Sequence, residues 1–206
     1  MFIEEMRNKF GYNIPIFTNE ILELFSQYTR AYVFRMLKAA EEKEEIIQLD
    51  TGVYYLPQMT PFGLSVITAS DVAKKKYIQN QSEIYGIYSG LTLQNEFSLT
   101  TQITNTPEII SNRASSRCRR ITIDGMQFVL RKARTEITSD NANAYRVLQL
   151  FTETDSVDIG EEEKRRISNY IRANKISPSE LIDLAKSFPV KTLQNLVYSG
   201  VLYETT

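Results

Sequence analysis

The sequence predicts an α+β protein, and three observations support this fold class. Apolar residues recur at helical spacing over residues 18–40, and an alternating apolar segment follows at residues 46–55. A second alternating segment, residues 121–130, is interrupted by Asp124-Gly125, a dipeptide that favours a two-residue hairpin turn. Beyond residue 160 the chain returns to helix start signals and helical spacing. Strands and helices in separate runs are typical of an α+β fold.

The first sixty residues predict a helix, a helix pair and a hairpin. A short helix over residues 1–10 should end at Gly11, which is a suitable C-cap. Thr18 is a plausible N-cap for the next helix, and a longer helix should start near Tyr28. Two strands should then flank Asp50-Thr51-Gly52, with the glycine at positive φ. The apolar side of the longer helix would hold Val33, Leu37 and Ala40.

This order of elements is that of a winged helix-turn-helix, in which the second helix of the pair enters the major groove of DNA. We therefore expect a DNA-binding domain over residues 1–60. The acidic flank that follows, residues 41–50, has five acids and one lysine, which repel phosphate. A protein-docking role for the same unit is the alternative. The outer face of the second helix would present Thr29, Arg30, Tyr32, Arg35 and Lys38 to the DNA.

A second domain is expected over residues 68–206, made of β-hairpins packed with helices and a helical C-terminal part. Ser70 should cap its first helix, in which residues 74–76 are three lysines that we expect to be solvated. Residues 85–99 are predicted to be mostly helical, with the helix opening around Ser89-Gly90. Residues 100–112, rich in Thr and Ile, predict one or two strands with a bend at Pro107.

Four further helices are predicted after the 121–130 hairpin. They cover residues 141–151, residues 161–173, a segment opened by Ser177-Pro178, and a last segment after Pro189. Ser177 has the residue type of an N-cap, and Pro178 then occupies the first helical position, so this start signal is specific.

The residues that the chain lacks narrow its chemistry. There is no histidine and only one cysteine, Cys118, so catalytic dyads with histidine and zinc sites built on His or Cys are excluded. No glycine-rich phosphate loop is present. We expect no enzyme activity, no cofactor, no metal and no small-molecule substrate. A nuclease using Mg²⁺ held by carboxylates stays an alternative, although no predicted strand carries an acid-x-Lys pair.

The sequence does not have the features of a membrane protein or of a secreted protein. No apolar run approaches the roughly 20 residues that cross a bilayer, and the N-terminus is charged. A single cysteine fits a reducing compartment. We therefore expect a cytoplasmic protein without membrane contact. The net charge is −1, so any attraction to nucleic acid must come from a local patch.

Such a patch is predicted within residues 111–135, which contain seven cations and one acid, Asp124. Arginine dominates, and its planar guanidinium suits paired hydrogen bonds to phosphate or carboxylate. We interpret the cluster as a docking surface for nucleic acid or an acidic partner protein. The alternative is that these charges only protect strand edges from pairing. The basic surface comprises Arg113, Arg117, Arg119, Arg120, Arg131, Lys132 and Arg134.

The chain resembles the AbiEi family, antitoxins of bacterial type IV toxin–antitoxin systems, over about residues 16–151. One motif closes the predicted wing, and the others follow in the order of the family's antitoxin domain. The first is Gly52-Val53-Tyr54-Tyr55-Leu56-Pro57. The others are Ser89-Gly90-Leu91, Leu99-Thr100-Thr101-Gln102, Ser111-Asn112-Arg113, and Gly125 with Phe128 and Arg131.

The resemblance implies a non-enzymatic protein whose winged domain binds operator DNA and represses its own operon. It also implies that the second domain counteracts a cognate nucleotidyltransferase toxin. The outer face of the second helix becomes the candidate groove contact, and the basic surface becomes the candidate contact for DNA or partner. The chain departs from the family at the end of the second helix, where winged domains of this kind often carry basic residues and a glycine. It has Glu41, Glu42 and Glu44 there, and Asp50 and Thr51 at the wing tip.

Overall fold

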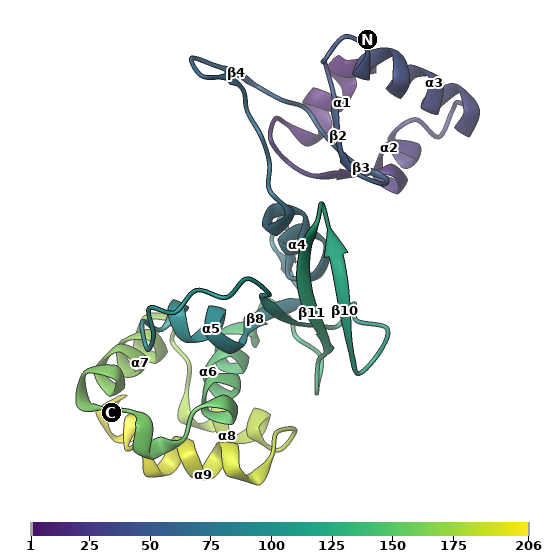
Figure 1. Ribbon diagram of the computed structural model, residues 1–206. Helices are drawn as coiled ribbons and strands as arrows, with labels where there is room; N and C mark the ends of the chain where they lie inside the picture. Colours follow the sequence, from purple (N-terminus) through teal and green to yellow (C-terminus); the bar gives the residue numbers. More distant parts are fainter. Residues whose placement is uncertain (1, 206) are drawn as a thin grey trace. The chain divides into compact units, whose positions relative to one another are not determined.

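The computed structural model describes residues 2–205 and confirms an α+β fold, with helices and small sheets along the whole chain (Figure 1). The chain divides into two compact units. The first comprises the chain up to Lys75 together with Ile123–Gly125, and the second comprises the remainder from Lys76. The predicted second domain begins at residue 68, whereas residues 68–75 group with the first unit.

The first unit contains the predicted helices and hairpin. A three-stranded antiparallel sheet has the order β1-β3-β2, and a buried core that includes Met6, Ile21, Val33 and Leu37 joins the helices to it. The elements are α1 (Phe2–Phe10), β1 (Ile16–Phe17), α2 (Thr18–Leu24), α3 (Arg30–Glu41), β2 (Ile47–Asp50) and β3 (Val53–Tyr55).

The start of α2 differs from the prediction. Thr18 is the first helical residue, and Phe17 is the N-cap. Phe17 has no capping hydroxyl, but Glu20, the third helical residue, accepts from the backbone N–H of Phe17 at 2.8 Å, as the acid of a capping box does. Thr18 instead donates its hydroxyl to the carbonyl of Gly52 at 3.1 Å. This bond ties α2 to the β2–β3 turn, where Gly52 has the predicted positive φ of 74°.

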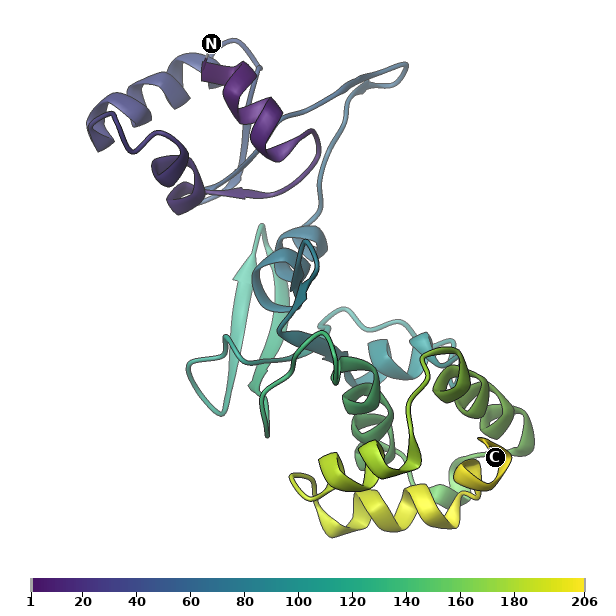
Figure 2. The same cartoon turned by 180° about the vertical axis from the view of Figure 1, so that it is seen from behind.

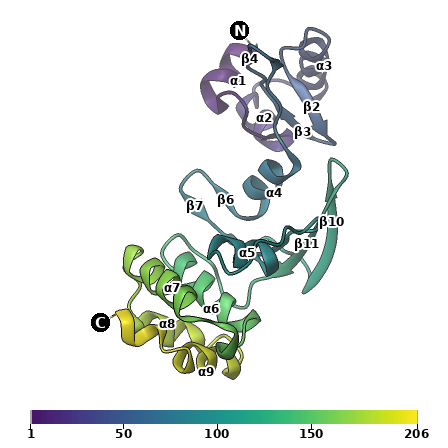
Figure 3. The same ribbon diagram turned by 60° about the vertical axis from the view of Figure 1, so that its left-hand side comes forward.

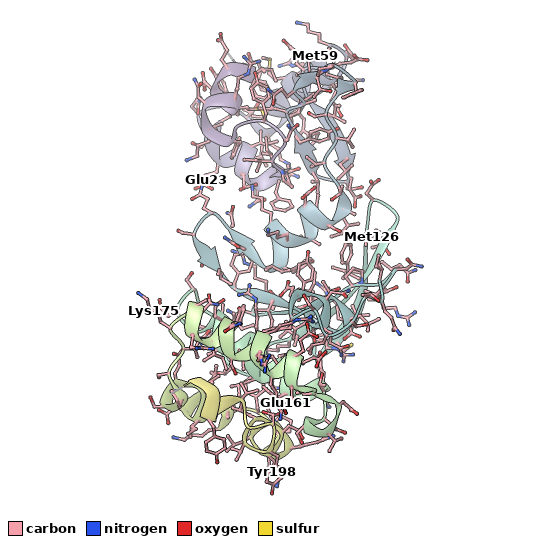
Figure 4. The ribbon with its side chains drawn as sticks, turned by 90° about the vertical axis from the view of Figure 1, so that its left-hand side faces the viewer. Glu23, Met59, Met126, Glu161, Lys175 and Tyr198 are labelled. Carbon is pink, nitrogen blue, oxygen red and sulfur yellow. The ribbon has the colours of Figure 1, made fainter. Side chains whose placement is uncertain are left out.

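A small hairpin and a helix follow the first sheet. The hairpin strands are β4 (Met59–Thr60) and β5 (Gly63–Leu64), and Met59, labelled in Figure 4, is largely exposed. Helix α4 (Ala69–Tyr77) is capped by Thr68 and not by Ser70, because the Thr68 hydroxyl accepts from the N–H of Asp71 at 3.2 Å.

Lys75, in the predicted solvated run of α4, is buried. Its side chain is 10% exposed, and its ammonium donates to the carbonyl of Pro15 at 2.7 Å. The same ammonium lies 2.8 Å from the Glu20 carboxylate. The prediction failed here because the partner carboxylate lies 55 residues earlier in the sequence.

The second unit is built on a four-stranded sheet with the order β10-β11-β9-β8. Strands β9 and β11 are parallel, and β8 pairs antiparallel with β9. Asp124 and Gly125 form the predicted turn between β10 and β11, with φ of 43° and 75°. The strands are β8 (Gly86–Ser89), β9 (Glu108–Ser111), β10 (Cys118–Ile123) and β11 (Met126–Lys132), and a separate hairpin joins β6 (Gln79–Asn80) to β7 (Glu83–Ile84).

The predictions between residues 85 and 112 were confirmed in part, since the helix begins at Gly90 as expected but the residues before it form a strand. Residues 86–89 form β8, and only α5 (Gly90–Glu96) is helical in this segment. Gly86 lets this strand lie close to the neighbouring backbone, because a side chain at this position would collide with the carbonyls of Tyr77 and Ile110. The Thr- and Ile-rich segment contributes only β9, since residues 101–107 have no regular structure.

The C-terminal helices lie where the sequence predicts them. Eight of the twelve residues of α6 are buried, and α6 packs against α7, α8 and α9 (Figures 1 and 2). Ser177 caps α8, accepting from the N–H of Glu180 at 3.1 Å. The elements are α6 (Ala142–Glu153), α7 (Glu161–Ala173), α8 (Pro178–Ala185) and α9 (Val190–Tyr198), with short 3₁₀ helices η1 (Ser156–Asp158) and η2 (Val201–Thr205).

Candidate nucleic-acid and anion-binding surfaces

One side of α3 is buried and the other is polar and exposed. Its apolar side fills the core of the first unit with Val33, Leu37 and Ala40. The opposite side carries the exposed cations Arg35 and Lys38, whereas Arg30 is exposed because it is the first helical residue. Thr29 is exposed but acts as the N-cap, since its hydroxyl accepts from the N–H of Tyr32 at 3.3 Å. The predicted DNA-facing residues are thus spread around α3, with Arg35 and Lys38 opposite its buried side, and their role in binding DNA stays a prediction.

Aromatic rings hold two of these guanidinium groups in place. The Arg35 guanidinium lies 5.3 Å from the centre of the Tyr32 ring, and the Arg30 guanidinium lies 5.4 Å from that of Phe34. Tyr32 in turn packs on Tyr28, with 5.0 Å between ring centres. Stacking restrains the guanidinium plane and leaves its N–H groups free to bond outward. The aromatic residues that order this face were not all predicted, since Tyr28 and Phe34 were absent from the expected set.

The acidic flank begins where α3 ends. Glu41 is the last helical residue, and Glu42, Glu44 and Glu45 are exposed in the turn that follows. At 1.5 Å per residue, Glu41 lies roughly 16 Å from Arg30 along the helix axis. Arg30 is therefore distant from these acids, whereas Lys38, in the last turn of α3, is only three and four residues before Glu41 and Glu42.

The predicted basic surface of the second unit is divided by the fold. Arg113 is held by neighbouring residues: its guanidinium lies 3.4 Å from the centre of the Tyr85 ring and donates to the carbonyl of Lys76 at 3.3 Å. It also lies 3.8 Å from the Glu83 carboxylate. Arg119 and Arg120 are exposed on β10, the edge strand of the sheet. Their position also suits the alternative in which charges protect an edge from pairing.

The other four members, Arg117, Arg131, Lys132 and Arg134, line one hollow of about 500 Å³. Helices α5 and α6, which lie against the sheet (Figure 3), form the opposite wall. Arg131 is paired with Glu108 on β9, with 2.8 Å between Nε and Oε2. That hydrogen bond raises the pKa of Arg131 above its usual value. The remaining residues lining the hollow are Gly90, Gln94, Ile110, Cys118, Gln149, Thr152 and Glu153.

A polar network on the α6 side of the hollow was missed by the sequence analysis. The Glu153 carboxylate accepts from the backbone N–H of Gly90 at 2.9 Å and from the Gln149 amide at 2.7 Å. It also accepts from the hydroxyl of Ser89. Ser89-Gly90 appears among the family motifs, but Glu153 lies 63 residues after Gly90, so the local sequence around Glu153 contains no signal for this contact.

Within the part of the chain that the structure describes, no three Asp, Glu or Cys side chains are grouped so that they could hold a metal ion. Among residues 2–205, no helix is both long and apolar enough to cross a bilayer.

Comparison of the chain with protein-family models finds no match, and comparison with curated proteins finds none either. The similarity to AbiEi antitoxins therefore rests on the motifs described above.

Proposed function

We propose that the protein is an antitoxin-type transcriptional autoregulator. The first unit would bind double-stranded operator DNA through α3, and the second would counteract a cognate nucleotidyltransferase toxin. The observation that supports the DNA-binding part is the exposed face of α3, where Arg35 and Lys38 lie opposite the buried core side, together with the exposed Arg30 at the N-terminus of the helix. The α3 helix also follows a short helix and precedes a hairpin, as in winged DNA-binding domains.

The charges along α3 suggest how it would enter the groove. Recognition helices contact bases mainly through their N-terminal residues, and this end of α3 carries Arg30. Arg35 would form paired hydrogen bonds with a guanine, and Lys38 would contact phosphate. The acids Glu42, Glu44 and Glu45 follow directly after the turn that holds Lys38, so they would weaken its contact with phosphate. The β2–β3 turn, Thr51-Gly52, has no cation, so α3 would provide most of the affinity.

The antitoxin part of the proposal is supported by the family motifs and by the basic residues of the second unit. Arg119 and Arg120 are exposed on β10, where an acidic surface of a partner could reach them. The cytoplasmic location expected from the sequence belongs to the same proposal.

A reporter gene placed behind the DNA upstream of the protein's own coding sequence tests the autorepression. The wild-type protein should repress the reporter, and Arg35→Ala should relieve most of the repression. Arg7→Ala is a matched control, because Arg7 is exposed in the same unit and lies 5.2 Å over the Tyr12 ring, a similar contact to that of Arg35. Equal repression by all three proteins would refute DNA binding by α3.

A second candidate function is supported by the acidic flank. Three exposed carboxylates, Glu42, Glu44 and Glu45, form a surface suited to a basic partner protein, which the protein would neutralise without reading DNA. Replacing all three by Gln separates the two functions. If α3 binds DNA, the triple variant should repress the reporter as well as or better than wild type, because repulsion of phosphate falls. If instead the flank binds a partner and the protein does not read DNA, the triple variant should lose antitoxicity. The wild-type protein should then show no repression of the reporter.

A further inference from the structure

The hollow of the second unit has the size and chemistry of a small-molecule site. Its volume of about 500 Å³ falls in the range of about 300–1,000 Å³ that is usual for ligand pockets. The cations lie on the β10–β11 side, and the polar groups of Gln94, Gln149 and Thr152 lie on the helical side.

The carboxylates at the hollow are already satisfied within the protein. Glu108 is bonded to Arg131, and Glu153 accepts from Gly90, Gln149 and Ser89. By contrast, Arg117, Lys132 and Arg134 form no ion pair with any carboxylate of the described residues, although Arg134 also lies 5.9 Å from the Phe188 ring centre. Three like charges at one hollow repel one another, so an anion bound there would be favoured.

The helical side of the hollow is polar but partly occupied within the protein. Gln149 is 5% exposed, and its amide nitrogen donates to Glu153 and to the hydroxyl of Ser89. Its carbonyl oxygen Oε1 has no hydrogen-bond partner among the described residues, but this atom is buried and not presented to the hollow. Gln94 also lines this side of the hollow.

We propose that the hollow binds a phosphorylated small molecule of about mononucleotide size. Its phosphate would lie among Arg117, Lys132 and Arg134, and the rest of the ligand would face the helical side, where Gln94 lines the hollow. Guanidinium and ammonium groups are the usual protein partners of phosphate. The ligand would act as an effector of the second unit, and its binding is independent of the proposed DNA contact.

Isothermal titration of the full chain with inorganic phosphate, pyrophosphate, ATP and GTP tests the proposal. We expect a nucleotide to bind more tightly than inorganic phosphate. Arg117→Ala and Lys132→Ala should each weaken that binding about tenfold, the usual scale for losing one charged hydrogen bond. Both residues are exposed, so neither variant should unfold the protein. Arg119→Ala, an exposed arginine outside the hollow, is the matched control and should change the affinity less than twofold.

Three outcomes would overturn the proposal. The first is that none of the four probes binds at millimolar concentration. The second is that Arg119→Ala weakens binding as much as Arg117→Ala, which would indicate diffuse attraction to the basic surface. The third is that duplex DNA alone binds and requires Arg117, which would make the hollow part of a nucleic-acid surface. Arg35→Ala should leave nucleotide binding unchanged, so failure of the DNA-binding proposal is distinguishable from failure of this one.

Discussion

The buried lysine of α4 allows a quantitative prediction for the first unit. Lys75→Ala removes the ammonium that lies 2.8 Å from the Glu20 carboxylate and donates to the carbonyl of Pro15. Removing one partner of a buried ion pair costs about 3–5 kcal/mol, because the other charge is left without compensation. The Glu20 side chain is 22% exposed and regains some water. We therefore expect the lower end, about 3 kcal/mol, or roughly a hundredfold in the unfolding equilibrium.

Urea unfolding of the full chain, followed by circular dichroism, would measure this loss. Hydrogen exchange of peptides from α1 and α2 would assign it to the first unit. Lys74→Ala is the control, since Lys74 is the exposed neighbour on the same helix, and it should change stability by less than about 0.5 kcal/mol. If Lys75→Ala costs no more than Lys74→Ala, the ion pair with Glu20 does not stabilise the fold and the reasoning is refuted.

Three further predictions concern the second unit. Gly86→Ala should cost more than about 3 kcal/mol, because its Cβ would lie 2.1 Å from the carbonyl oxygen of Tyr77. Thermal unfolding would measure this loss, with Gly160→Ala as the control, because the atom close to Gly160 belongs to the flexible Glu163 side chain. Equal melting temperatures for the two variants would contradict the prediction. Ser177→Ala removes the N-cap of α8 and should cost about 1 kcal/mol in urea unfolding. A loss no larger than that of the exposed control Ser187→Ala would speak against the cap. Burial raises the pKa of Tyr145, although the hydrogen bond that its hydroxyl accepts from the backbone N–H of Arg134 lowers this pKa in part. The unfolded chain therefore loses this proton first, so the stability contribution is complete below about pH 10 and falls as the pH rises through the folded pKa. Tyr145→Phe should show a shallower alkaline loss of stability, and parallel curves for variant and wild type would exclude this cause.

The features that the sequence predicted well depend on residues close together in the chain. The Ser177 cap acts on an N–H three residues away, and the turn at Asp124-Gly125 needs only two residues with positive φ. The positive φ of Gly52 was predicted for the same reason. The apolar side of α3 was also predicted correctly, because its 3.6-residue period is contained within one helix.

The features that the sequence did not predict depend on distant partners. Lys75 belongs to a run of three lysines, a pattern that indicates a solvated helix. Only the fold brings Glu20 against Lys75. Residues 86–89 form a strand because β9 pairs with them, and residues 108–111 of β9 come some twenty positions later. The charge of the basic cluster was overestimated for a similar reason. Its window contains Arg113 and Arg131 but not Glu83 and Glu108, which partner them.

The most direct test of the central claim is the affinity of the purified protein for its own upstream DNA. Fluorescence anisotropy at several salt concentrations would compare this duplex with a scrambled duplex, for wild type and Arg35→Ala. We predict tight, sequence-selective binding by wild type, and a loss of about 1–3 kcal/mol in binding free energy for Arg35→Ala, with reduced selectivity. Weak binding that is equal for both duplexes and insensitive to Arg35→Ala would contradict the proposal that α3 reads operator DNA.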